Sequence, residues 1–555
     1  MLSLPFAGNA IFDSAETLSA DAPCLPGTQR RILSEIQDWA ENPNGEVIFW
    51  LHGMAGTGKT SVALTVANAL NEREPFTAGR TPPSTAFLGA SFFFKQGDAT
   101  RNNTATFFPT LARCLAEVFP DFKSHIVSAI NERLAIGTKA PSQQLRHLIV
   151  EPLSVLDEET YLPVRLVVVV DALDECLEQE EARVLLEMLA TLEHLHQVQL
   201  RLLITSRRDK HLVGGFERLP SVLYRPVLLD KVQTSTEKNG STDDITFYLS
   251  YTLAKIAEKH GVSQNWIDEA DVHKLSQKAD GLFIYAATAC RFLDAEDFTD
   301  EEARLERLEQ IFEDDGEVKG PQQKVDEIYL KVLSFPHLAS STKKTRKRVY
   351  SRTGAILGFL AVLFEPVSVS SLGVFVSLPK ETLDDILRQL NSIVSVPQDE
   401  KSPLGLVHLS FRDFILNEER SKQLQFQIEE TTMHRKVLRR CLDIMSSELF
   451  QDICKVILPA KLASEVPRSQ IEQNIPQHLR YACRYWIDHL AKLDQDGRLE
   501  NELQDNGEIH AFLKERFLYW LEAMSFIGET PTTITMINKL QGMINVSYIP
   551  LRVIR

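Results

Sequence analysis

A disulfide framework, a basic surplus and a membrane-length apolar run are all missing from this sequence of 555 residues. Its seven cysteines are scattered, odd in number and never spaced as Cys-x-x-Cys, which indicates a reducing compartment and offers no zinc site. The net charge of −16 disfavours a general nucleic-acid binder, because phosphate backbones need a basic face. The apolar run from Thr353 to Phe364 is too short to span a bilayer.

Two further signals are absent. The opening residues, MLSLPFAGNAIFDSAE, carry no basic region, which argues against a secretory signal, and no repeat of fixed period is present. We therefore expect a cytoplasmic protein with no membrane span. The length indicates about three or four domains.

The most informative stretch present is Gly53 to Thr60 (GMAGTGKT), which has the phosphate-binding pattern G-x-x-x-x-G-K-[ST]. Val47 to Leu51 predicts a buried strand leading into it, and Ser61 to Leu70 predicts a helix leading out. Glycines let successive backbone N–H groups point at an anion, and the start of the helix adds the positive end of its dipole. The alternative, an ordinary glycine-rich turn, does not need this flanking strand and helix.

We expect this loop to bind a nucleoside triphosphate. Lys59 would reach the β- and γ-phosphates, and the Thr60 hydroxyl would hold Mg²⁺. The residues predicted to contact the nucleotide are Gly53, Gly56, Thr57, Gly58, Lys59, Thr60 and Ser61. No N-K-x-D element for guanine follows a predicted strand, so ATP or ADP is favoured and GTP stays an alternative.

Alternating strand-like and helical segments predict the fold of the first half. The further strands are expected at Ala86 to Phe94, Leu166 to Val170, Leu200 to Thr205 and Val222 to Leu229. This alternation is typical of a parallel sheet with helices on both faces, which binds ligands at the carboxyl ends of its strands. The fold class is therefore an α/β P-loop NTPase core, followed by a helical domain, a winged helix and a C-terminal helical region.

Acidic residues follow the strand at 166–170. Asp171 stands at its tip, where a carboxylate would bind Mg²⁺ opposite Thr60. Asp174 and Glu175 come next, and either could act as the general base or orient the attacking water. The alternative is that these two acids only favour the N-terminus of a following helix.

An arginine pair, Arg207 and Arg208, follows the fourth strand. A guanidinium at this position could contact the γ-phosphate, because it is permanently charged and bidentate toward phosphate. Arg207 is the better candidate, and a solvated surface arginine is the competing interpretation.

These motifs together resemble the NACHT-domain proteins of the STAND class of signal-transduction ATPases, in the form common in fungi. The resemblance covers roughly residues 20 to 490 and depends on CLPGT from Cys24, GMAGTGKT, FFF from Phe92, VVVVDALDEC, ITSRRD, GLFIY from Gly281 and LVHLSFRDF from Leu406. It implies a nucleotide-controlled switch, closed with ADP, that opens and oligomerises with ATP and acts on protein partners. It also implies that His408, in the winged helix, contacts the β-phosphate of ADP; a histidine satisfied in the winged-helix core is the alternative.

The chain departs from this family's pattern in three places. Gln29 follows Thr28 where many relatives carry arginine, and Gln96 precedes Gly97 where relatives often show arginine, so Arg101 is offered as a charge partner. An effector domain and sensor repeats are not evident, which suggests a minimal switch or a truncated gene model. The cluster Lys343 to Arg348 is expected to be a solvated interdomain linker rather than a nuclear signal.

The predicted organisation is a short N-terminal leader at 1–27, a NACHT P-loop NTPase domain at 28–232, a helical domain with linkers at 233–345, a winged-helix-like domain at 346–420 and a C-terminal helical region at 421–555. The predicted function is a signalling switch controlled by nucleotide. Slow ATP hydrolysis by the same protein would reset the switch. A nucleotide-locked scaffold without turnover is the alternative. A P-loop kinase has less support, and a helicase is disfavoured by the acidic balance.

Overall fold

The computed structural model describes residues 4–96, 98, 100–118, 120–133, 135–155, 164–176, 179–195, 198–229, 244–263, 266–294, 301–313, 320–334, 342–397, 399, 402–456, 463–493 and 502–548. The chain forms two compact units, Met1–Ile328 and Tyr329–Arg555. The polar stretch from Gln233 to Asp244 is a predicted linker; its residues 233–243 lie outside the described residues, as does Gly97. Within those ranges no helix is long and apolar enough to cross a membrane.

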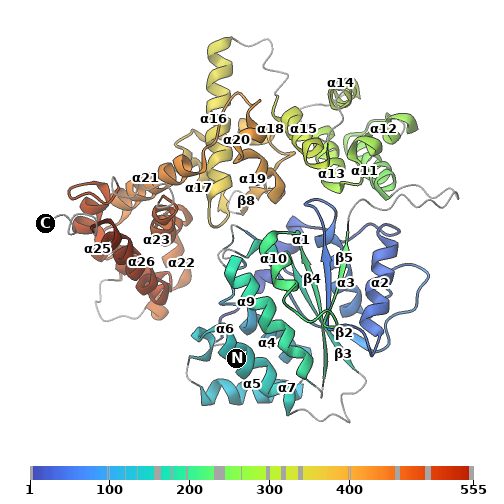
Figure 1. Cartoon of the computed structure of the whole chain (residues 1–555). Coiled ribbons are helices and arrows are strands. Elements are labelled where there is room, and N and C mark those ends of the chain that lie inside the picture. Colours follow the sequence, from blue (N-terminus) through green and yellow to red (C-terminus); the bar gives the residue numbers. More distant parts are fainter. Residues whose placement is uncertain are drawn as a thin grey trace. The chain divides into compact units, whose positions relative to one another are not determined.

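A five-stranded sheet is the centre of the first unit (Figure 1). Its strands are β1 (Ile48–His52), β2 (Ala86–Phe93), β3 (Arg165–Asp171), β4 (Gln199–Ser206) and β5 (Tyr224–Leu228). They are hydrogen-bonded in the order β2-β3-β4-β1-β5, and every pair is parallel. All five predicted strands are confirmed.

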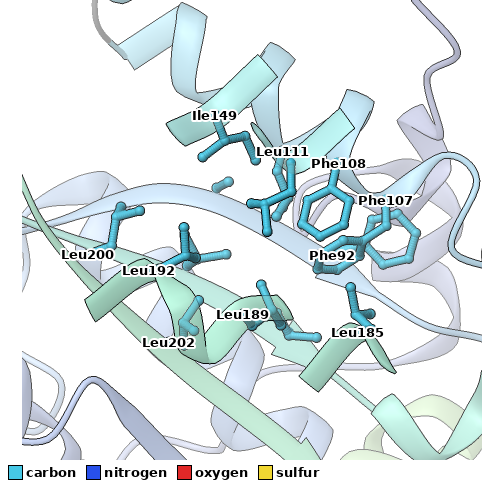
Figure 2. Packing of buried hydrophobic residues seen from close by; sticks show 14 of the residues in the cluster. Phe92, Phe107, Phe108, Leu111, Ile149, Leu185, Leu189, Leu192, Leu200 and Leu202 are labelled. Carbon is cyan, nitrogen blue, oxygen red and sulfur yellow. The ribbon is translucent and has the colours of Figure 1, made fainter. Parts of the chain in front are cut away.

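Helices cover both faces of this sheet, which is why its strands are apolar along their whole length. In β3, Val167 and Val169 pack into one core with α2 (Arg30–Glu41) and α3 (Lys59–Glu72). Val168 and Val170 pack into a second core with α4 (Phe107–Val118) and α9 (Gln179–Ala190). Figure 2 shows the second core, in which Leu200 and Leu202 of β4 and Phe92 of β2 lie among leucines of α9 and phenylalanines of α4. Each such side chain contributes about 1.5–3 kcal/mol when fully buried.

The helices of the first unit are α1 (Ala15–Ala20), α2 (Arg30–Glu41), α3 (Lys59–Glu72), α4 (Phe107–Val118), α5 (Pro120–Glu132), α6 (Pro141–Leu145), α7 (Glu151–Ser154), α9 (Gln179–Ala190), α10 (Lys210–Phe216), α11 (Asp244–His260), α12 (Glu269–Ala279), α13 (Phe283–Leu293) and α14 (Glu301–Phe312), while α15 (Pro321–Leu333) crosses the division between the units. Short 3-10 or π turns lie at Gly8–Ala10, Ile136–Thr138, Arg146–Val150, Leu173–Glu175 and Thr191–His194. The N-terminal segment is part of this fold. The backbone N–H of Ala7 donates to Thr110 Oγ1 at 3.0 Å, and that of Phe12 donates to Ser91 Oγ at 3.0 Å.

The second unit begins with a winged helix. Helix α16 (Lys343–Val362) is followed by β6 (Val367–Ser368), α17 (Val369–Val376), α18 (Lys380–Gln389), β7 (Val394–Ser395) and β8 (Pro403–Leu406). The three strands pair antiparallel in the order β6-β8-β7, which confirms the predicted succession of short helices and a hairpin. The remaining elements are α19 (Leu409–Ile415), α20 (Glu418–Ser421), α21 (Glu430–Glu448), the 3-10 turn Ala463–Glu465, α22 (Arg468–Asn474), α23 (Gln477–Ala491), α25 (Glu508–Phe526) and α26 (Thr530–Tyr548).

The interpretation of the basic cluster as a linker was wrong. Residues 343–348 form the first turns of α16, and the Thr342 side chain caps this helix by accepting a hydrogen bond from the N–H of Thr345. Positive charge near a helix N-terminus opposes the dipole, so composition alone favoured a loop. The apolar second half of α16, with Ile356 and Phe359 buried, stabilises the helix in spite of its charged start.

A buried polar chain joins the winged helix to the C-terminal helices. His434 on α21 and His489 on α23 face each other with 2.8 Å between their Nδ1 atoms. His489 Nε2 lies 2.9 Å from the Tyr481 hydroxyl, which accepts a hydrogen bond from the N–H of Phe364 at 3.0 Å. Burial lowers the pKa of both histidines, and Glu430 partly opposes this for His434. One of the two facing nitrogens can donate a proton to the other. If both nitrogens were protonated, two donors would face each other and the pair would be destabilised.

Mild acid should destabilise this second unit. The unfolded chain binds protons at its histidines near a pKa of about 6.5, whereas the folded pair resists them, so stability is lost as the pH falls through that value. A drop from pH 7.5 to 5.5 should cost roughly 1 kcal/mol for each of the two histidines. Thermal unfolding followed by circular dichroism at both pH values measures this. The pH dependence should shrink in His489→Gln and be unchanged in His510→Gln, whose side chain is exposed; equal pH dependence in both variants would contradict the assignment.

Candidate nucleotide-binding site

The loop between β1 and α3 requires glycine at three positions. Gly56 and Gly58 have φ values of +80° and +95°, a conformation that side chains with a Cβ rarely adopt. Gly53 has another reason, because a Cβ there would lie 2.7 Å from the carbonyl oxygen of Leu229, just beyond β5. The pattern of glycines thus follows from backbone conformation at two positions and from close packing at the third.

Lys59 begins α3 and turns back over this loop. Its Nζ donates to the carbonyl oxygens of Gly53 and Met54 at 3.0 and 2.7 Å. Burial lowers the pKa of Lys59, while the carboxylates of Asp174 and Asp171 act in the opposite direction. The ammonium group therefore lies beside both the loop and the acids that follow β3.

Asp171 ends β3 and is buried. Its Oδ1 accepts a hydrogen bond from Thr205 Oγ1, at the end of β4, at 2.5 Å. Burial raises the pKa of Asp171 to about 7, although hydrogen bonds from Thr205 and Thr60 lower it. The predicted partners Asp171 and Thr60 therefore lie near each other.

These two residues fit a Mg²⁺ ion. A carboxylate and a hydroxyl supply the hard oxygen ligands that this ion prefers, and Mg²⁺ commonly takes its other ligands from phosphate and water. No cluster of three or more His, Cys, Asp or Glu residues suited to a metal occurs in the described part of the chain. The donor set is therefore suited to a metal that arrives with phosphate, and to Mg²⁺ in particular.

Asp174 and Glu175 occupy different environments. Asp174 Oδ1 accepts from the backbone N–H of Arg207 at 3.0 Å, and its Oδ2 lies 3.2 Å from Arg207 Nε. Glu175 Oε2 accepts from the backbone N–H of Gln96, beyond β2, at 2.9 Å. Burial raises the pKa of Glu175 to about 8, and the neighbouring Asp174 adds to this rise. Asp174 therefore holds Arg207, while Glu175 is a buried carboxylate with a raised pKa.

A positive φ of 55° at Ala172 turns the chain after β3 and leads into the 3-10 turn that carries both acids. The Ala172 N–H donates to Thr205 Oγ1 at 2.9 Å, which ties this turn to β4. Arg208, one residue beyond Arg207, is exposed.

The helical segment at Gly281 to Tyr285 contacts the phosphate loop directly. The N–H of Ile284, in the first turn of α13, donates to the carbonyl oxygen of Gly56 at 3.1 Å. Its side chain packs so closely that a Cβ on Gly56 would lie 2.1 Å from Ile284 Cγ2. The loop is thus in contact with a helix that lies more than 200 residues away in the sequence.

His408 lies in the second unit, as the N-cap of α19. Its Nδ1 accepts from the N–H of Ser410 at 3.1 Å. Its contact with a nucleotide stays a prediction. Arg101 Nε lies 2.7 Å from Asp98 Oδ2, and both residues are buried. Its role as a charge partner in place of the relatives' arginine stays a prediction.

The family model described as "Nephrocystin 3, N-terminal" matches residues 27–207. The vegetative incompatibility protein HET-E-1 of Podospora anserina is 24% identical over 541 residues, which cover 92% of this chain and 36% of that protein. Both matches agree with the resemblance carried by the motifs. The chain is thus similar to this family over residues 27–207 and to this fungal protein over most of its length.

Two solved structures are also similar to this chain. A signal transduction ATPase with numerous domains, carrying a tetratricopeptide repeat sensor, from Pyrococcus horikoshii is 13% identical, with 96% of this chain and 66% of that one covered and a TM-score of 0.39. A Walker-type ATPase of Pyrococcus abyssi is 14% identical, with 71% and 99% covered and a TM-score of 0.32.

Several contacts of this site were not predicted from the sequence. Thr205 had a usable signal, because it ends a strand next to the one that carries Asp171. Ile284 had a signal only through the family resemblance, which implies that the segment Gly281 to Tyr285 begins a helical element packed on the nucleotide. Gln96 had none, because its contact joins segments that are distant in the sequence.

Substituting Gly56 by alanine should separate loop strain from helix packing. Gly56→Ala should destabilise the first unit by about 2–4 kcal/mol, from a positive φ and a clash with Ile284. Gly79→Ala is the matched control, because its φ is +87° but nothing lies within 4 Å of an added Cβ, so we expect only about 1–2 kcal/mol. Thermal unfolding and hydrogen exchange at the Ile284 amide measure both effects; equal losses in the two variants would contradict the packing argument.

Proposed function

We propose that this chain is a nucleotide-controlled signalling switch that binds ATP or ADP with Mg²⁺ and hydrolyses ATP slowly. The contact between Ile284 and Gly56 carries the proposal. A helix outside the sheet is hydrogen-bonded to the loop predicted to hold phosphate, so a shift of that loop acts directly on α13. An enzyme that only turned over a metabolite would not need this connection.

In this proposal each side chain has a separate task. The loop N–H groups and Lys59 bind the β- and γ-phosphates, and Thr60 with Asp171 would hold Mg²⁺, which neutralises phosphate charge when bound. Glu175 in its ionised form accepts a proton from the attacking water, and burial, which raises its pKa to about 8, strengthens it as a base. Asp174 orients Arg207 toward the γ-phosphate, since it accepts from the N–H of Arg207 and lies beside Nε.

The same groups would distinguish ATP from ADP. A ligand shifts a conformational equilibrium only by its difference in affinity for the two states. Lys59 and Arg207 are the cations that the γ-phosphate would meet, so their contacts supply that difference. We propose that the ATP state opens and self-associates, and that hydrolysis restores the closed state.

The comparison supports a signalling role. The aligned relative is named as a vegetative incompatibility protein. This chain spans about a third of that relative's length. The activity and partners of this chain are therefore stated as proposals. A nucleotide-locked scaffold differs from the leading proposal only in turnover, and the experiment below separates the two.

Replacing Lys59, Glu175 and Asp174 one at a time tests the proposal. Lys59→Ala should weaken Mg-ATP binding about 100-fold, because charge-assisted contacts to phosphate are lost. Glu175→Gln should keep binding and slow phosphate release about 10²- to 10⁴-fold, because an amide cannot accept the proton. Asp174→Ala should slow release without abolishing binding. Calorimetry and a phosphate-release assay measure these outcomes.

Glu180→Gln is the control, since this exposed acid of α9 pairs with Arg183 on the surface. It should match the original chain in both assays. Full nucleotide binding by Lys59→Ala would refute the site. Binding without any phosphate release by the unmodified chain would favour the scaffold.

A further inference from the structure

The N-terminal segment is hydrogen-bonded to residues that follow β2. Asn9 lies in the short 3-10 turn Gly8–Ala10. Its side-chain Nδ2 donates to Asp98 Oδ2 at 3.1 Å and to Thr100 Oγ1 at 2.9 Å. One amide therefore joins two parts of the chain that are 89 residues apart.

Asn9 completes a buried ion pair. Arg101 Nε lies 2.7 Å from Asp98 Oδ2, and the two residues are only 4% and 7% exposed. A buried pair is stable only when its remaining donors and acceptors are also bonded. Asn9 supplies both, because its Nδ2 donates to Asp98 and its carbonyl oxygen accepts from Arg101 Nη1 at 3.2 Å. Loss of the Asn9 amide should therefore displace the pair.

The backbone connects this ion pair to Glu175. The Lys95 N–H donates to the carbonyl oxygen of Arg101 at 3.1 Å, and the Asp98 N–H donates to the carbonyl oxygen of Lys95 at 3.2 Å. Lys95 is thus held at both of its backbone polar groups. The next residue, Gln96, donates its N–H to Glu175 Oε2 at 2.9 Å. The position of the Gln96 N–H, and so of the carboxylate, depends on the ion pair.

Charge connects the same residues. Burial lowers the pKa of Lys95 and the charge of Arg101 lowers it further, whereas the charges of Asp21, Glu175 and Asp98 raise it. The Lys95 ammonium therefore interacts with Glu175 and with both members of the ion pair. A displaced pair would alter the electrostatic environment of Glu175 as well as its hydrogen bond.

We propose that Asn9 is a positioning residue for ATP hydrolysis, which acts on Glu175 through the ion pair and the Gln96 N–H. This inference rests on the proposed function, in which Glu175 accepts the proton of the attacking water. A proton acceptor must lie within hydrogen-bond reach of that water, so a small displacement slows the chemical step. Nucleotide binding depends on the phosphate loop instead. Release of the N-terminal segment from its contacts would therefore slow turnover while nucleotide stays bound.

Asn9→Asp tests this, because aspartate keeps the shape of the side chain but turns a carboxylate oxygen toward Asp98. Phosphate release from Mg-ATP in a single turnover should slow about 10- to 100-fold, the range expected for a displaced catalytic group. The dissociation constant of Mg-ATP, measured by calorimetry on the full chain, should change less than about twofold. Asn9→Ala removes the same donor without adding charge, and it should slow release in the same direction.

A double-mutant cycle separates positioning from a general loss of stability. Residues that act through one another have non-additive effects on rate. In a Glu175→Gln background, Asn9→Asp should therefore slow the residual release by less than about twofold. A loss that did not act through Glu175 would slow release by the same factor in both backgrounds.

Thr110→Val is the matched control. The buried Thr110 hydroxyl, on α4, accepts from the N–H of Ala7 at 3.0 Å, so it fastens the same N-terminal segment at another point. This variant should lower the melting temperature and leave the rate of phosphate release unchanged.

The possible failures are distinguishable. If Glu175→Gln slows release but Asn9→Asp and Asn9→Ala do not, this inference is wrong and the proposed function stands. Equal slowing by Asn9→Asp in both backgrounds, or slowing by Thr110→Val as large as that by Asn9→Asp, would make the amide structural. Weaker Mg-ATP binding in Asn9→Asp would contradict an effect on turnover alone. If Glu175→Gln does not slow release, the role proposed for Glu175 fails, and this inference fails with it.

Discussion

The order of the parallel strands is the constraint on which the site depends. β4 is hydrogen-bonded between β1 and β3, so the carboxyl ends of these three strands meet at one edge. The phosphate loop follows β1, Asp171 ends β3, and Arg207 follows β4. Thr205 connects two of these strand ends by its hydrogen bond to Asp171. A different strand order would separate the loop from the acids.

Burial then gives these groups their chemistry. Charges inside a protein interact more strongly than in water. The charges of Lys59 and Arg207 and those of the acids after β3 therefore stabilise one another. The pKa of Asp171 rises to about 7 and that of Glu175 to about 8 because both carboxyls are desolvated. A buried carboxylate is stabilised by a nearby cation, which agrees with the proposed binding of Mg²⁺ by Asp171. A carboxyl with a raised pKa is suited to proton transfer, which agrees with the role proposed for Glu175.

The sequence predicted the sheet and the loop well, for physical reasons. Strands covered on both faces are continuous apolar runs, as Leu166 to Val170 are, and a phosphate-binding loop needs glycine at fixed positions. The division of labour between Asp174 and Glu175 was not predictable, because it depends on the backbone N–H groups of Arg207 and Gln96. The same holds for Ile284, whose contact with Gly56 spans more than 200 residues. Local pattern identifies the chemical groups, and tertiary packing assigns their roles.

The central claim is that one nucleotide binds at the loop after β1 with Mg²⁺. The most direct measurement is mass spectrometry of the nucleotide released by denaturing the purified chain after incubation with Mg-ATP and removal of free ligand. We predict that each chain releases about one adenine nucleotide, as ATP or ADP. When EDTA is present throughout, we predict that no nucleotide is released. Release of no nucleotide, or the same amount from a chain with Gly58 and Lys59 deleted, would contradict it.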